Sequence, residues 1–68
     1  MLILEKIGKN IVLLRKEKKI TQEQLALNAD MSVSYLRAIE HGAANPTMDA
    51  LARIADALDE PFFVVFHP

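Results

Sequence analysis

Residues 33–41 carry side chains that could contact nucleic acid, and they recur at the spacing of one helix face. The outward positions of a helix here hold Val33, Ser34, Arg37, Ala38 and His41. An arginine can donate two hydrogen bonds to guanine or bind a phosphate, and a serine hydroxyl can bond to donors or acceptors. Valine and alanine can touch the methyl group of thymine. The pattern therefore predicts a helix whose outer face suits the edges of bases.

Two short helices joined by a tight turn are predicted to position this face. Thr21 and Gln24 have the spacing of a capping box that starts the first helix, and Ser32 can cap the second. The periodicity breaks at residues 28–30, and Gly42 stands where a helix stop is wanted. The positions expected to face inward are Leu25, Ala26, Ala29, Leu36, Ile39 and Glu40. Residues 21–42 therefore predict a helix-turn-helix.

Four blocks of residues, in this order, resemble a known family. They are T-Q-E-Q-L-A at 21–26, S-x-S-Y-L-x-x-I-E-x-G at 32–42, N-P-T at 45–47 and L-x-x-I-A-x-A-L at 51–58. Over about residues 7–66 the chain resembles the phage repressor and Cro-like, or XRE-type, helix-turn-helix transcriptional regulators. The resemblance implies an all-α fold of five helices, with residues 1–68 forming a single DNA-binding domain.

The resemblance also implies which residues contact DNA. The expected base contacts are Ser32, Val33, Ser34, Arg37 and Ala38. The expected phosphate contacts are Gln22, Tyr35, His41 and Asn45. For Tyr35 we expect first a half-buried ring that packs on the core, and a hydroxyl contact with phosphate is compatible with that role. Relatives often carry Lys or Arg where Ala43 and Ala44 stand, so reduced affinity and salt dependence are expected.

Several charged residues are expected to have structural roles, in an ion pair or in the turns between helices. Arg15 lies one position beyond the apolar stripe of the first helix, and the resemblance implies that it pairs with Glu40. The alternative is a solvated arginine. Asp30 and Asp59 occupy turn positions that are usually glycine in relatives, and aspartate tolerates left-handed backbone better than most residues. Arg53 is expected to be solvated.

Length and composition narrow the function classes. The 68 residues contain no cysteine, and the two histidines, His41 and His67, lie far apart, so no disulfide or zinc site is expected. No nucleophile–base pair, carboxylate dyad or glycine-rich phosphate loop can be assembled, so we expect neither an enzyme nor a cofactor. No apolar run approaches the ~20 residues that span a bilayer, and residues 1–4 are too short for a signal-peptide core. We expect a soluble cytoplasmic protein.

The formal net charge is −1, but the charges are segregated along the chain. Residues 1–19 carry six basic and two acidic side chains, a local charge of +4, whereas the remaining residues carry −5. A segregated field of this kind can steer phosphate towards one face of a protein. An ordinary solvated helix face is the alternative interpretation.

Apolar residues at both ends suggest a contact with a second subunit. Residues 1–4 read MLIL and residues 62–66 read FFVVF. In the second segment Phe62, Val65 and Phe66 keep the spacing of a core helix, whereas Phe63 and Val64 should face outward. A short strand paired with residues 1–4 is an alternative for this segment. We expect residues 60–68, through Phe63 and Val64, to form the dimer contact; the alternative is an end that packs on its own domain.

These features favour a sequence-specific regulator of transcription that binds double-stranded DNA. A homodimer would set two recognition helices roughly 34 Å apart on a pseudo-palindromic operator, most simply as a repressor. The alternative is a protein-binding helical module, such as an antitoxin or the partner of another regulator, with weak DNA affinity or none. The residues of the loop 43–44 and the apolar groups at 33 and 38 favour that alternative.

Overall fold

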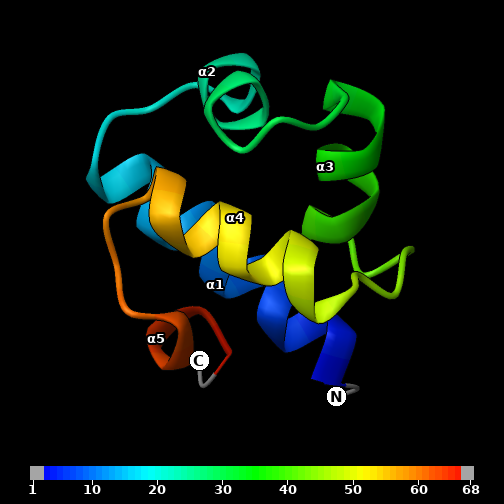
Figure 1. The fold of residues 1–68 in the computed structure, drawn as a ribbon. Helices are drawn as coiled ribbons and strands as arrows, with labels where there is room; N and C mark the ends of the chain where they lie inside the picture. Colours follow the sequence, from blue (N-terminus) through cyan, green and yellow to red (C-terminus); the bar gives the residue numbers. More distant parts are fainter. Residues whose placement is uncertain (1–2, 67–68) are drawn as a thin grey trace.

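The computed structural model describes residues 3–66, except for the side chain of Phe66, and this part of the chain is folded into five helices (Figure 1). They are α1 (Ile3–Glu17), α2 (Gln22–Asn28), α3 (Val33–Glu40), α4 (Met48–Ala57) and α5 (Phe62–Phe66). The expected all-α, five-helix fold is confirmed. Residues 62–66 form a helix and not a strand, and residues 3–4 belong to the first turn of α1. Residues 1–2 and 67–68, which include His67, lie outside the described residues.

Three hydroxyl side chains start helices, and two of them, Thr21 and Ser32, do so as the sequence predicts. Thr21 Oγ1 accepts from Gln24 N at 3.1 Å, and Gln24 Oε1 accepts from Thr21 N at 2.9 Å, which completes the capping box of α2. Ser32 Oγ accepts from Tyr35 N at 3.1 Å at the start of α3. Thr47 caps α4 in the same way. Each cap satisfies a backbone N–H that has no partner inside its helix.

Left-handed residues end the first four helices. Asp30 and Asp59 have φ values of 56° and 57°, and Gly42 has a φ of 72°, as expected from their positions. Lys19 also adopts φ 58°, which no sequence signal indicates. Each is followed by an N–H that bonds back to a carbonyl in the last turn; Met31 N, for example, donates to Ala26 O at 3.0 Å. These bonds fix sharp turns, so short helices can pack on one another.

The core lies between the helices and draws on all five of them. Helix α1 packs against α3 and α5, α2 packs against α3 and α4, and α4 packs against α5. Figure 1 shows α4 across the middle of the molecule, with α2 and α3 on one side and α5 on the other. The largest fully buried side chains are Ile11, Leu25, Leu36, Ile39, Ile54, Leu58 and Val65. Burial of these apolar groups is the main source of stability.

Gly8 allows α1 and α3 to approach closely. A Cβ at this position would lie 2.6 Å from Ile39 O and would also clash with Glu40 O. Both obstructing atoms are backbone carbonyl oxygens at the C-terminal end of α3, so a side chain at position 8 could be accommodated only by moving a helix. The close approach therefore fixes this end of α3 against α1.

Candidate nucleic-acid interface

The outer face of α3 is the candidate surface for base contacts. Ser34, Arg37 and His41 are exposed, whereas Leu36 and Ile39 on the opposite face are fully buried. Ala38 is half-buried beside them. The helix therefore presents a hydroxyl, a guanidinium and an imidazole on its outer side. These groups can form hydrogen bonds with base edges or phosphates.

The N-terminal turn of α3 combines contacts with the core and exposed groups. Val33 and Tyr35 are half-buried and pack against the core, which supports the packing role expected for the Tyr35 ring. Ser32 is exposed, and its hydroxyl oxygen is occupied by the cap while its hydrogen remains able to donate. Part of Val33 is thus committed to the core, and only the remainder could reach a thymine methyl.

A buried carboxylate joins three helices behind this surface. Glu40, at the end of α3, has a side chain only 4% exposed. Its Oε2 accepts from Arg15 Nε at 2.9 Å, and its Oε1 accepts from Arg15 Nη2 at 3.3 Å and Gln22 Nε2 at 2.8 Å. Arg15 Nη1 also donates to Ile20 O at 3.2 Å, in the α1–α2 turn. The pair that the resemblance implies is therefore present, and it is bidentate.

Gln22 has a structural contact in addition to its expected role at phosphate. It is the first residue of α2, is half-buried, and donates one N–H to Glu40. A glutamine amide has two N–H groups, so the second remains able to reach a phosphate. The bond to Glu40 holds the amide in one orientation. The family resemblance implies only the phosphate contact of Gln22; the bond to Glu40 has no signal in the sequence, because it depends on how α2 and α3 pack.

The loop after α3 has few charges. Ala43 and Asn45 are exposed, whereas Ala44 packs against the core. Asn45 is therefore available for a phosphate contact. Ala44 offers no such contact, and its methyl group helps to close the core beneath the loop.

The basic residues of α1 and the turn after it do not all remain free. Arg15 is paired with Glu40, and Lys18 Nζ lies 2.9 Å from Glu60 Oε2. The other four, Lys6, Lys9, Lys16 and Lys19, are exposed. The positive field expected from residues 1–19 is thus reduced by two pairs, and its exposed part lies on α1 and the α1–α2 turn.

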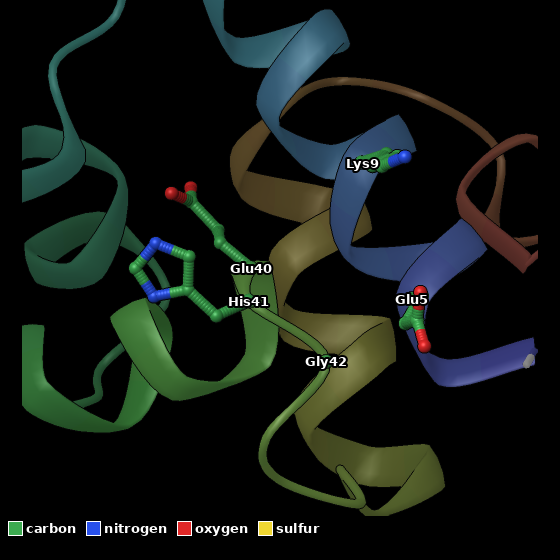
Figure 2. Close-up of a pocket in the computed structure, with 5 residues that line it drawn as sticks. All are labelled: Glu5, Lys9, Glu40, His41 and Gly42. Carbon is green, nitrogen blue, oxygen red and sulfur yellow. The ribbon is translucent and has the colours of Figure 1, made fainter.

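A pocket beside this region does not bring polar groups together. It is lined by Glu5 and Lys9 of α1 and by Glu40, His41 and Gly42. Figure 2 shows the Glu40 and His41 side chains directed to one side, and those of Glu5 and Lys9 lying on the other helix. The carboxylate of Glu40 is already bonded to Arg15 and Gln22. The pocket therefore offers no convergent set of donors and acceptors for a small ligand.

Helix α5 is anchored to α1 and leaves one large aromatic residue exposed. Asn10 Nδ2 donates to Val64 O at 2.5 Å and to Val65 O at 3.3 Å. Phe63 is 64% exposed. The expectation that Val64 faces outward is wrong in part, since Val64 is half-buried and packs against the core. Because α5 contacts both α1 and α4, its flank touches the core as well as its inner face.

The expectation that Arg53 is solvated is wrong in part, because its guanidinium bonds to two backbone carbonyls. Its Nη1 donates to Asp30 O at 2.6 Å and to Ala29 O at 3.3 Å, across the turn between α2 and α3. Its Nε lies 3.2 Å from Asp49 Oδ2, one turn earlier on α4. No local sequence signal indicates this contact, because it depends on the packing of α4 against α2.

The chain is similar to known proteins over most of its length. The helix-turn-helix family profile matches residues 11–65. The immunity repressor protein of Bacillus phage phi105 is 46% identical over 52 residues, which are 76% of this chain but 36% of the repressor. The chain thus spans about a third of that relative. No helix within residues 3–66 is long and apolar enough to cross a bilayer.

Solved structures with the same fold include two restriction–modification controller proteins. C.AhdI from Aeromonas hydrophila superposes with a TM-score of 0.90 and 32% identity, covering 93% of this chain and 96% of that protein. The C.Esp1396I tetramer in complex with its natural 35-base-pair operator gives a TM-score of 0.88 and 32% identity, covering 97% of this chain and 87% of that one. The chain belongs to the XRE-type helix-turn-helix family of DNA-binding transcriptional regulators.

Proposed function

We propose that this protein is a sequence-specific regulator of transcription that binds operator DNA as a homodimer and acts as a repressor. One observation carries the proposal: α3 exposes its hydrogen-bonding face while its inner face is fixed to α1 and the core. Ser34, Arg37 and His41 are exposed, and Glu40 is held by Arg15. A rigid helix with a free polar face is what readout of the major groove requires.

The similar proteins support the proposal of an operator-binding regulator. The related controller C.Esp1396I was solved as a tetramer on its operator, and the phage relative is an immunity repressor. By analogy, α3 would lie in the major groove while α2 crosses the backbone. A regulator of this kind acts in the compartment that contains the DNA, so we expect a cytoplasmic localisation. No catalytic role is proposed.

The residues of the interface would divide between base and phosphate contacts. Ser34 and Arg37 would supply the hydrogen bonds to bases, and Ala38 and the exposed part of Val33 would touch thymine methyl groups. Ser32, at the cap, would be a further donor. The proposed phosphate contacts are Gln22, Tyr35, His41 and Asn45. Phosphate contacts of this kind fix the register on the duplex, and base contacts select the sequence.

The proposed dimer contact is centred on α5. Phe63 is a large apolar side chain with 64% of its surface exposed, on a helix that Asn10 ties to α1. A twofold axis beside α5 would bury Phe63 against its counterpart and set the two copies of α3 for successive major grooves. Val64 would contribute its exposed part.

Selection of duplexes from a random library, followed by binding measurements at two salt concentrations, tests the function. We expect the selected duplexes to share a pseudo-palindromic motif and to bind far more tightly than random DNA. The same assay addresses the protein-binding alternative, which the apolar groups Val33 and Ala38 favour. Failure to enrich any motif, with no binding to random duplex even at low salt, would refute the DNA-binding function in favour of that alternative.

A further inference from the structure

A side chain of α4 holds the turn between α2 and α3 from outside. Arg53 Nη1 donates to the carbonyl oxygens of both Ala29 and Asp30. The bond to Asp30 is 2.6 Å long, which is short for a charge-assisted hydrogen bond. Its Nε lies 3.2 Å from Asp49 Oδ2 without forming a hydrogen bond, so the exposed Asp49 contributes little to the position of the guanidinium. One guanidinium nitrogen therefore clamps two consecutive carbonyls of the turn.

The turn needs such support because its own bonds cover only part of its backbone. Asp30 is left-handed, and its N–H donates to Leu27 O at 3.2 Å, while Met31 N donates to Ala26 O at 3.0 Å. These bonds satisfy carbonyls inside α2. The carbonyls of Ala29 and Asp30 lie just beyond the C-terminal end of α2, where the negative end of the helix dipole also favours a cation. Within residues 3–66, Arg53 is the donor that the structure brings to them.

The two ends of α3 are fixed by different neighbours. At the C-terminal end, Glu40 is bonded to Arg15 and the backbone rests against Gly8. At the N-terminal end, the helix continues directly from the turn that Arg53 clamps. Ser32 and Ser34 belong to this second end. The clamp therefore acts on the part of α3 whose position matters most for base contacts.

We propose that Arg53 is a positioning residue for DNA recognition: it sets the orientation of the N-terminal end of α3 through the α2–α3 turn, without touching DNA. This inference rests on the proposed function. A small displacement of side chains that must meet base edges weakens directional hydrogen bonds strongly, while contacts with the uniform backbone tolerate it. Loss of the clamp should therefore reduce discrimination between operator and random DNA more than it reduces binding as such.

Arg53 could instead bind a phosphate directly, and salt dependence separates the two roles. Each lost phosphate contact lowers the slope of log affinity against log salt concentration by about 0.9. A positioning role leaves this slope unchanged, because the number of phosphates neutralised stays the same.

The test uses the full chain with Arg53→Met, which keeps an unbranched side chain but removes every donor. Arg53→Lys restores a charge and one point of contact. Asp49→Ala removes only the exposed partner of Arg53, and Glu60→Gln breaks the distant Lys18–Glu60 pair as a control for general stability. For each variant we would measure affinity for the selected operator and for random duplex at two salt concentrations. Amide exchange of the free protein would be followed at Met31 and Leu36, whose N–H groups are hydrogen-bonded on either side of the start of α3.

We expect Arg53→Met to lose roughly tenfold in operator affinity, the size expected for a hydrogen bond to a charged group. Random-duplex binding and the salt slope should change little, and the amides of Met31 and Leu36, which donate to Ala26 O and Ser32 O, should exchange faster. Arg53→Lys should recover part of the affinity. Asp49→Ala and Glu60→Gln should bind the operator like the original protein.

Three results would overturn the proposal. The first is a salt slope lowered by about 0.9 per protomer in Arg53→Met, because this would mean a direct phosphate contact. The second is an operator affinity of Arg53→Met within about twofold of the original. The third is an equal loss of operator affinity in Glu60→Gln. If the unsubstituted protein binds no DNA, the proposed function fails, and the exchange measurement still decides about the clamp. If the Met31 amide then exchanges at the same rate in both Arg53 variants as in the original protein, the clamp of the α2–α3 turn by Arg53 is refuted. If Arg53→Met does not fold, Arg53→Lys carries the comparison.

Discussion

Replacing Arg15 with methionine is expected to remove a large share of the folding free energy. Arg15 links α1 to the end of α3 through Glu40 and to the α1–α2 turn through Ile20 O. Methionine keeps much of the aliphatic length, so the packing of the stem is largely retained. The change therefore isolates the guanidinium and leaves Glu40 with Gln22 as its remaining partner.

The expected magnitude follows from the burial of Glu40. Its side chain is 4% exposed, and in the variant it would lose two of its three N–H donors. Removing one partner of a buried ion pair costs about 3–5 kcal/mol, because the remaining charge stays buried without compensation. A domain of this length has a total stability of about 3–10 kcal/mol. The variant should therefore lose half or more of its stability, with a fall in Tm of more than ~10 °C.

Urea denaturation followed by circular dichroism would measure these free energies. The matched control is Glu60→Gln, which breaks the more exposed Lys18–Glu60 pair and should cost about 0–1 kcal/mol. The double variant Arg15→Met/Glu40→Leu replaces both charges with apolar groups. It should be more stable than Arg15→Met alone, because no buried charge is left unpaired.

Two results would contradict this reasoning. A loss in Arg15→Met no larger than that in Glu60→Gln would mean that the pair behaves like an exposed surface contact. If the loss in the double variant equals the sum of the losses measured for Arg15→Met alone and for Glu40→Leu alone, the two charges act independently. Either result would remove the buried pair from the account of how α3 is fixed.

The remaining predictions concern helix packing, base contact and the dimer. Gly8→Ala should destabilise by about 1–3 kcal/mol in urea denaturation, since the new Cβ meets backbone carbonyls; an unchanged midpoint would contradict the close approach. Arg37→Ala should weaken operator binding by about 1–3 kcal/mol and relax sequence preference at one position if it reads a base, whereas uniform weakening would mean phosphate contact. Phe63→Glu should give monomers in sedimentation and weaker operator binding, and a persistent dimer would exclude Phe63 from the interface.

Much of the fold can be predicted because its signals are local. Thr21, Ser32 and Thr47 each precede a helix by one position, and the capping bond involves residues three apart. The left-handed conformations of Asp30 and Asp59 were anticipated through the family resemblance, because relatives usually carry glycine at these two positions. The sequence does not decide whether residues 62–66 form a helix or a strand, because so short an apolar run fits the periodicity of both. Its packing against α1 and α4 settles it as a helix.

Contacts that depend on tertiary packing could not be predicted from the residues alone. The Arg15–Glu40 pair spans 25 positions and was anticipated only through the family resemblance. The bonds of Arg53 to the α2–α3 turn and of Gln22 to Glu40 were missed, because a polar residue on a helix flank looks the same whether water or a carbonyl is its partner. Which face such a residue meets is decided by the packing of the helices.

The two arginine contacts together explain how a seven-residue helix can hold a recognition helix steady. Helix α2 is too short to be stable by itself, and each turn that flanks it contains a left-handed residue other than glycine. Arg15 of α1 bonds to Ile20 O in the first turn, and Arg53 of α4 bonds to Asp30 O in the second. The flanking helices thus supply cations to the carbonyls of both turns. The orientation of α3 is therefore a property of the whole domain, and substitutions in α1 and α4 should alter DNA recognition without contacting DNA.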